Sequence, residues 1–205
     1  CLDIFSAEMS CLHLDEDSFF ECCQHLLKKS EELRDGWSWE TVQVRLRMQC
    51  KCTHVCKDDD ADEGAVEINC PAAEGGSHLC FQFEFHVVFS SSYRTPVLYF
   101  RAFSLGKSLS LEDVWSFIQP KLRLTSQDAL LNTITQQEHP LLGQAFFMLH
   151  PCKTQDFMRP VLQTAQQENR AVNYVLTWLS VVAPLVGLDV PLEYCSDLRP
   201  GSKPD

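Results

Sequence analysis

Two apolar runs joined by a short polar stretch constrain the fold of this chain more than any other feature. From Leu79 to Val87, apolar residues alternate with polar or small ones, which is the period of a β-strand with one buried face. After the turn "SSSYRTP", the run "VLYFRAF" is apolar almost throughout, as expected for a more fully buried strand. Because only a short turn joins the two strands, they are predicted to pair antiparallel.

Further elements are predicted on the N-terminal side of this hairpin. Ser18 and Glu21 have the spacing of a helix-capping box, and apolar residues then recur at helical spacing up to the "RDGW" break. This pattern predicts an amphipathic first helix. Alternation of apolar and polar residues from Trp37 to Gln49 predicts one strand, which completes a three-stranded meander.

The C-terminal side is predicted to be mainly helical. Ser110 and Asp113 open the short helix "LEDVWSFIQ", and "QAFFML" is a fourth strand, while residues 121 to 137 are left unassigned. A helix is expected from about Thr154 toward residue 167, with Pro160 tolerated only in or near its first turn. A last helix, with one apolar face over residues 172 to 182, is expected to stop at Pro184.

This order of elements predicts an α+β fold with an N-terminal helix, an antiparallel β-meander and C-terminal helices. The 205 residues fit a single domain, 1–205, since roughly 100 to 200 residues per domain are usual. Within it, residues 50–78 lose periodicity and are predicted to be a loop insertion. Residues 1–8 are expected to be frayed or non-native, and residues 200–205 to form a frayed tail.

The acidic balance of the chain argues against two classes of partner. Lys and Arg number 17 against 28 Asp and Glu, so the net charge of -11 repels nucleic acid and anionic lipid. No apolar run reaches the roughly 20 residues that span a bilayer, and the first residues lack the pattern of a secretory signal. We therefore expect no nucleic acid, no stable membrane insertion, a cytosolic or nuclear location with the cytoplasm favoured, and reduced cysteines.

One of the 11 cysteines, Cys152, is distinguished by its position. It follows the strand "QAFFML" and the pair His150 and Pro151, and it precedes the helix start at Thr154. Pro151 has no backbone donor, so strand pairing must stop there. The free amides of the helix start, with Lys153 beside them, favour a thiolate. These features suit a nucleophilic thiol at the edge of the sheet, although a small buried cysteine fits the letters "HPC" as well.

Three separated blocks of the sequence resemble the E2-like enzymes of autophagy. They are "YRTPVLYFRAF", "TITQQEHPLLGQAFFMLHPCKT" and "NYVLTWLSVVAPLVGLDVPL". The resemblance covers most of residues 80 to 195, extends more loosely to the first helix and strand, and implies a ubiquitin-conjugating (E2)-like fold. In that family the cysteine of "HPC" forms the thioester, and it corresponds to Cys152 in this sequence.

The resemblance also implies partners and chemistry. An E1-like enzyme, autophagy-related protein seven, is expected to hand a ubiquitin-like modifier, autophagy-related protein twelve, to Cys152. A lysine of the acceptor, autophagy-related protein five, then takes the modifier, which supports autophagosome formation. Because the E1-like enzyme spends the ATP, neither a cofactor nor a metal is implied. Whether a second ubiquitin-like modifier is handled stays open.

The group that supports the oxyanion is open as well. Ordinary ubiquitin E2 enzymes carry His-Pro-Asn ahead of the cysteine, whereas the motif ends in Leu141 here, so another donor must stabilise the tetrahedral intermediates. The candidate donors are Tyr93, Thr133, Thr135 and Asn173, led by Tyr93 and Thr133, with His150 and Pro151 as further supporting residues. Each of them also fits an ordinary structural role. His139 and His86 are candidate bases.

Two alternatives belong to other classes. A zinc-binding interaction module could use ligands drawn from Cys50, Cys52, His54, Cys56, Cys70, His78 and Cys80, but "CKCTHVC" lacks paired C-x-x-C spacing. A non-catalytic binder of ubiquitin-like proteins would have no need of the cysteine in "HPC". The acid run at 58–63 is expected to be a solvated face, with docking of a basic partner as the other possibility.

Overall fold

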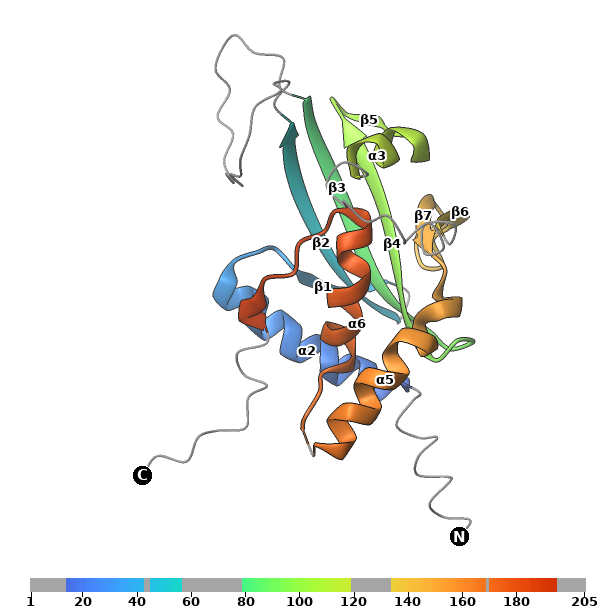
Figure 1. Ribbon diagram of the computed structural model, residues 1–205. Coiled ribbons are helices and arrows are strands. Elements are labelled where there is room, and N and C mark those ends of the chain that lie inside the picture. Colours follow the sequence, from blue (N-terminus) through green and yellow to red (C-terminus); the bar gives the residue numbers. More distant parts are fainter. Residues whose placement is uncertain (1–13, 43–44, 57–78, 119–133, 169, 195–205) are drawn as a thin grey trace.

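The computed structural model describes residues 14–42, 45–56, 79–118, 134–168 and 170–194. Within these ranges a seven-stranded sheet has the order β1-β2-β3-β4-β7-β6, and β5 pairs with the end of β4. All its described pairs are antiparallel. Helices α2 and α6 lie over the sheet, and α5 extends past the lower end of β4 (Figure 1). The predicted α+β class, with a meander between an N-terminal helix and C-terminal helices, is confirmed.

Helix α2 (Glu16–Leu33) begins earlier than the predicted capping box. Its N-cap is Asp15, whose carboxylate accepts the backbone N–H of Ser18 at 2.7 Å, and this bond lowers the pKa of Asp15. The box at Ser18 and Glu21 is therefore wrong, because a carboxylate three residues upstream already satisfies the amide of Ser18. The helix ends at the predicted "RDGW" break, where Arg34 adopts a left-handed conformation.

The single strand predicted from Trp37 to Gln49 is in fact a hairpin. Strands β1 (Ser38–Val42) and β2 (Arg45–Cys56) pair antiparallel, with Val42 opposite Arg45. A tight reversal leaves the alternation of apolar and polar residues intact, so the periodicity does not reveal it. Strand β2 also includes residues 50 to 56, which were predicted to belong to the insertion. Residues 57–78, with the acid run at 58–63, lie outside the described residues.

The central strands agree with the prediction. Strands β3 (Leu79–Ser90) and β4 (Thr95–Ser104) form the expected hairpin, and β5 (Lys107–Ser108) follows. Helix α3 (Leu111–Ile118) has the predicted capping box, since the N–H of Asp113 donates to Ser110 Oγ and the N–H of Ser110 to Asp113 Oδ2. Strand β7 (Ala145–Leu149) is the fourth predicted strand, and it pairs with the unpredicted strand β6 (Ile134–Glu138).

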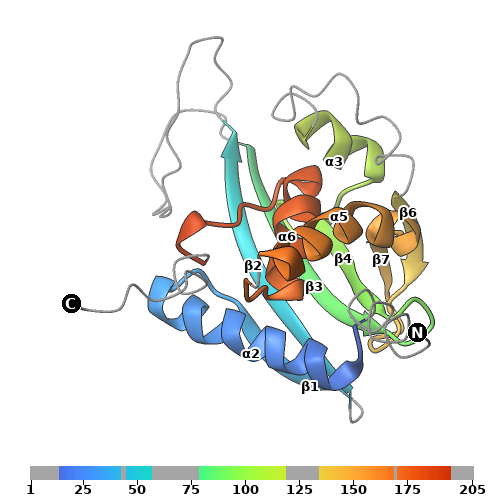
Figure 2. The same ribbon diagram turned by 60° about the horizontal axis from the view of Figure 1, so that its bottom comes forward.

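Two helices follow the strands, as predicted. Helix α5 (Thr154–Gln167) contains Pro160 in its interior, beyond the first turn to which the prediction confined it. Helix α6 (Tyr174–Val182) starts at the N-cap Asn173 and is followed by the 3-10 turn η2 (Ala183–Val186), which contains Pro184. In the view of Figure 2, α2, α5 and α6 lie in front of the sheet. No helix within the described ranges combines the length and apolar character needed to cross a membrane.

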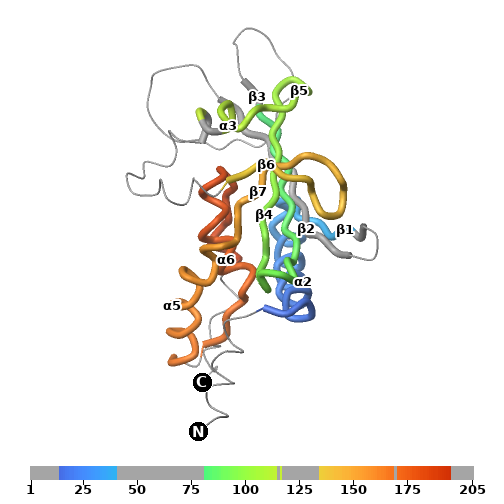
Figure 3. The backbone as a smooth tube through the Cα atoms, turned by 90° about the vertical axis from the view of Figure 1, so that its right-hand side faces the viewer, coloured from blue at the N-terminus to red at the C-terminus, as the bar shows by residue number. Residues whose placement is uncertain are grey.

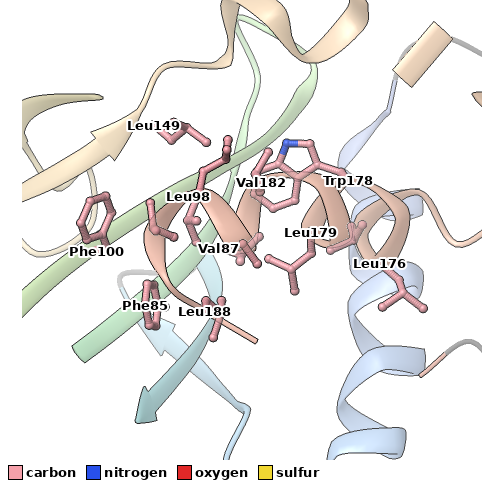
Figure 4. Packing of buried hydrophobic residues seen from close by; sticks show 14 of the residues in the cluster. Phe85, Val87, Leu98, Phe100, Leu149, Leu176, Trp178, Leu179, Val182 and Leu188 are labelled. Carbon is pink, nitrogen blue, oxygen red and sulfur yellow. The ribbon is translucent and has the colours of Figure 1, made fainter. Parts of the chain in front are cut away.

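The sheet carries apolar cores of unequal size. In the large core, Phe85 and Phe100 of the sheet pack together with Trp178 and Leu179 of α6 (Figure 4). A second cluster, which we call the minor core, consists of Val88, Val97, Tyr99, Leu141, Phe146 and Met148. Since neighbouring residues of a strand point to opposite faces, Phe146 and Met148 face away from the large core that receives Phe147 and Leu149. The connection between β6 and β7 curls over the face away from α6 (Figure 3).

Candidate active site

Cys152 lies where β7 ends and helical structure begins. The strand stops at Leu149, and a 3-10 turn, η1 (Pro151–Lys153), leads directly into α5. Pro151 occupies the first position of this turn, where its missing amide leaves no hydrogen bond unmade, and it is buried. Thr154, on the other side, is only 3% exposed. The thiol of Cys152 is free and exposed between these two anchors.

His150 holds the backbone of this turn. Its Nδ1 accepts the backbone N–H of Cys152 at 3.2 Å, which makes His150 the N-cap of η1. An atom that accepts from an amide carries no proton, so the hydrogen-bond network assigns the proton of the neutral ring to Nε2. His150 Nε2 lies 3.3 Å from Tyr93 Oη, and the two rings meet edge to face with centroids 5.4 Å apart. The Nε2–H of His150 therefore donates to the phenol oxygen, which leaves the hydroxyl proton of Tyr93 free for another acceptor.

Tyr93 reaches this place from the turn between β3 and β4. The residue is 45% exposed, so it lies at the surface beside the turn of the thiol. The structure thus brings three predicted supporting residues, Tyr93, His150 and Pro151, to the segment that carries Cys152. The amide of Cys152 and the imidazole of His150 connect the tyrosine to the turn of the thiol.

The other candidate donors lie elsewhere. Thr133 falls outside the described residues. Thr135 is an exposed residue of β6 opposite Met148, and its hydroxyl accepts from Gln137 Nε2 at 3.5 Å. Asn173 caps α6: its Oδ1 accepts the N–H of Leu176 and its Nδ2 donates to the carbonyl of Cys22, each at 2.9 Å. Asn173 therefore has the structural role that its sequence position also allowed.

The two candidate bases are not accessible. His86 and His139 are both 0% exposed, and His86 Nδ1 lies 3.1 Å from His139 Nε2. Both rings pack against Phe146 of the minor core, with centroids 4.9 Å and 4.8 Å from it. A base must reach the proton that it removes, so neither imidazole can serve a thiol on the surface.

The charged side chains beside the thiol largely offset one another. Lys153 Nζ lies 3.9 Å from Asp156 Oδ2, and both side chains are exposed, so the predicted cation beside Cys152 has a counter-charge in the next turn. A small pocket adjoins the same turn, with walls that include Leu149, Pro151 and Trp178. The turn of the thiol is therefore seated on apolar side chains.

The zinc alternative is weakened by the course of β2. Its proposed ligands between Cys50 and Cys56 occupy alternate positions of one strand, where six residues span about 20 Å. One zinc ion holds all its ligands within about 2.3 Å, so this extended segment cannot supply four of them. Cys70 and His78 lie outside the described residues. Among the side chains that the structure describes, no group of three or more His, Cys, Asp or Glu could hold a metal.

Comparisons with known proteins give a consistent result. The family model of the "Autophagocytosis associated protein, active-site domain" matches residues 18–193. The chain is 38% identical to ubiquitin-like-conjugating enzyme ATG10 of Homo sapiens over 202 residues, which cover 88% of this chain and 92% of that protein. It is 38% identical to the protein of that name in Arabidopsis thaliana over 60% of this chain and 55% of the relative. Autophagy-related protein 3 of Dictyostelium discoideum is 26% identical over 55% of this chain and 33% of the relative.

The fold is an antiparallel sheet with one N-terminal and two C-terminal helices, and it matches the active-site domain of autophagocytosis-associated proteins. These two findings define the class of E2-like conjugating enzymes. This class is the one that the sequence resemblance predicted. The chain belongs to the family of autophagocytosis-associated proteins, among which it is similar to the ubiquitin-like-conjugating enzymes ATG10.

Proposed function

We propose that the chain accepts a ubiquitin-like modifier as a thioester on Cys152 and passes it to a lysine amine of an acceptor protein. In the first step the sulfur attacks the carbonyl of the E1-bound thioester, and the thiol of the E1-like enzyme leaves. In the second step the amine attacks the new thioester, an isopeptide bond forms, and the thiol of Cys152 is released. The observation that carries this proposal is the free, exposed thiol of Cys152, fixed at the end of β7 by its neighbours.

The partners in this proposal follow from the family. The relatives are named ubiquitin-like-conjugating enzymes, which supports a ubiquitin-like protein as the acyl group. The resemblance of the three sequence blocks points to autophagy-related protein twelve as modifier, seven as E1-like enzyme and five as acceptor. In this assignment the chain contributes to autophagosome formation.

Tyr93 is the proposed donor to the oxyanion. Each acyl transfer passes through a tetrahedral intermediate whose oxygen gains negative charge and needs a donor that is already in place. His150 Nε2–H occupies the phenol oxygen of Tyr93 and leaves its hydroxyl proton to donate. His150 and Pro151 are positioning residues in this account, because they act through the backbone of η1.

The complete reaction tests the proposal. Purified E1-like enzyme, Mg-ATP, modifier and acceptor, mixed with the wild-type chain, are expected to yield a modifier–acceptor conjugate that survives reductant. The Cys152→Ala variant should yield none, while Cys22→Ala, which changes a partly buried thiol, should leave the yield unchanged. Conjugate at the wild-type rate with Cys152→Ala would place the nucleophile elsewhere. Tight binding of the modifier without any conjugate would favour the non-catalytic binder.

A further inference from the structure

A line of hydrogen bonds runs beside the minor core and ends in an ion pair. The backbone N–H of Leu141 donates to His139 Nδ1 at 3.2 Å, and His139 Nε2 lies 3.1 Å from His86 Nδ1. His86 Nε2 lies 3.0 Å from Glu84 Oε1, and Arg101 Nε donates to Glu84 Oε2 at 2.7 Å. We call Glu84, His86 and His139 the relay.

The direction of every bond in the relay follows from one backbone amide. Since the N–H of Leu141 can only donate, His139 Nδ1 carries no proton, and the proton of the neutral ring is on Nε2. This proton is donated to His86 Nδ1, so the proton of His86 is in turn on Nε2 and is donated to Glu84. Both imidazoles are thus neutral, and a second proton on either ring would break one of these bonds.

The charges around the relay favour a carboxylate at its end. The hydrogen bond from His86, and then the hydrogen bond and the positive charge of Arg101, hold the pKa of Glu84 at about 2 against the opposing effect of burial. On β4, Tyr99 faces the imidazole of His139 with a ring distance of 4.8 Å, and burial raises its pKa. On β2, Lys51 pairs in register with Glu84, and Glu138, the last residue of β6, directly precedes His139.

The relay holds one side of the minor core. Leu141 belongs to the turn that follows His139, and this turn is tied by the N–H of His139 to the carbonyl of Gln144 at 2.7 Å. The minor core also includes one β3 residue, Val88, and β3 ends at Ser90, just before the turn that carries Tyr93. On β7, which ends at Leu149, its member Met148 lies two residues before His150 in the chain. Short stretches of chain therefore join Tyr93 and His150 to members of the minor core.

We propose that His139 is a positioning residue for acyl transfer, which acts through the relay and the minor core on the alignment of Tyr93 with His150. This inference rests on the proposed function of Cys152. The hydrogen bond between Tyr93 and His150 is long, at 3.3 Å, and exposed, so it is too weak to hold the two side chains in place by itself. Its alignment depends on the strands that hold both residues. A misplacement of about 1 Å can cost about 100-fold in rate.

Nitrogen-detected correlation spectra of the imidazole rings test the relay in the wild-type chain, without any catalytic assay. We expect His86 and His139 in their neutral forms, each with its proton on Nε2, down to a pH at which a free histidine, with a pKa of about 6.5, is mostly charged. A proton on Nδ1 of either neutral ring, or titration of either ring near pH 6.5, overturns the relay.

A double-mutant cycle tests the positioning role. His139→Asn keeps an oxygen near the N–H of Leu141 and loses the bond to His86, and Tyr93→Phe removes the hydroxyl alone. We expect His139→Asn to slow the charging of Cys152 about tenfold with the KM for the modifier unchanged. The double variant should be no slower than Tyr93→Phe, because both changes remove the same alignment. His25→Asn, the same substitution at an exposed position of α2, is the matched control and should have no effect.

The outcomes separate this inference from the proposed function. Rate effects of His139→Asn and Tyr93→Phe that simply multiply mean that His139 does not act through Tyr93, and the inference is then wrong. Normal charging by a folded His139→Asn has the same meaning. A wild-type chain that is never charged contradicts the proposed function, and with it the positioning role, while the spectra still decide whether the relay exists.

Discussion

Tyr93 Oη and His150 Nε2 lie 3.3 Å apart, although 57 residues separate them in the chain. The same imidazole accepts the backbone N–H of Cys152 through its other nitrogen. One side chain therefore connects the turn between β3 and β4 to the turn that carries the exposed thiol. The pairing of the strands therefore helps to fix the position of the turn at which acyl transfer is proposed.

Removing the hydroxyl of Tyr93 tests its role as oxyanion donor. Tyr93→Phe keeps the ring that meets His150 edge to face, and we expect it to slow transfer from Cys152 about 100-fold, as is typical for one lost donor. The free energy of unfolding should change by less than about 1 kcal/mol, because the side chain is half exposed. Single-turnover discharge of the isolated thioester onto an amine measures the rate. A rate equal to that of the wild type would assign the oxyanion to another donor.

The described thiols should differ in reactivity. Burial raises the pKa of Cys22 and raises that of Cys23 much further, so both are protonated at neutral pH and Cys23 is also inaccessible. Cys152 is exposed. We expect brief treatment with iodoacetamide, followed by peptide mapping, to find Cys152 labelled in the native protein and Cys23 only after unfolding in urea. Rapid labelling of Cys23 in the native protein would contradict the packing of α2.

Glu84 should make the stability of the fold depend on pH. Its pKa of about 2 in the fold lies below the ordinary value of 4.5, so the ionised form is favoured by folding. This contribution is fully present above about pH 4.5 and is lost as the pH falls toward 2, and it amounts to at most about 3 kcal/mol.

Urea unfolding at a series of pH values from 6 downward measures this contribution. The free energy of unfolding of Glu84→Gln should be lower than that of the wild type at pH 6, and the two should converge as the pH falls. A constant difference between them over this range would mean that Glu84 does not titrate as its hydrogen bonds indicate.

The strands show what periodicity can and cannot reveal. The hairpin of β3 and β4 was predictable because Phe83, Phe85 and Phe100 are buried at the period of a strand on either side of a polar turn. The reversal between β1 and β2 was not, because alternation continues across it without an Asn-Gly or similar turn signal. Strand β6 has one buried residue, Ile134, so its polar sequence gave no strand pattern.

The site was predictable only as far as local sequence determines it. The end of β7, the interruption at Pro151 and the start of α5 follow from neighbouring residues, and they predict that Cys152 lies between a strand and a helix, as it does. The contact of Tyr93 with His150 and the burial of His86 against His139 depend on how distant strands pair, and no local pattern encodes such pairing. Ser18 and Asn173 show the reverse. Ser18 matched a capping pattern, but Asp15 caps the helix instead, and Asn173 was a candidate donor, but its amide group is used to cap α6 and to bond Cys22.

The most direct test of the central claim is the bond that the modifier forms at position 152. With E1-like enzyme, Mg-ATP and modifier but no acceptor, the wild-type chain should form an adduct that dithiothreitol removes. Cys152→Ser should form an adduct that dithiothreitol leaves intact, because an oxygen ester resists thiol exchange, and Cys152→Ala should form none. A dithiothreitol-labile adduct that still forms on Cys152→Ser would contradict the account, since another cysteine would then carry the acyl group.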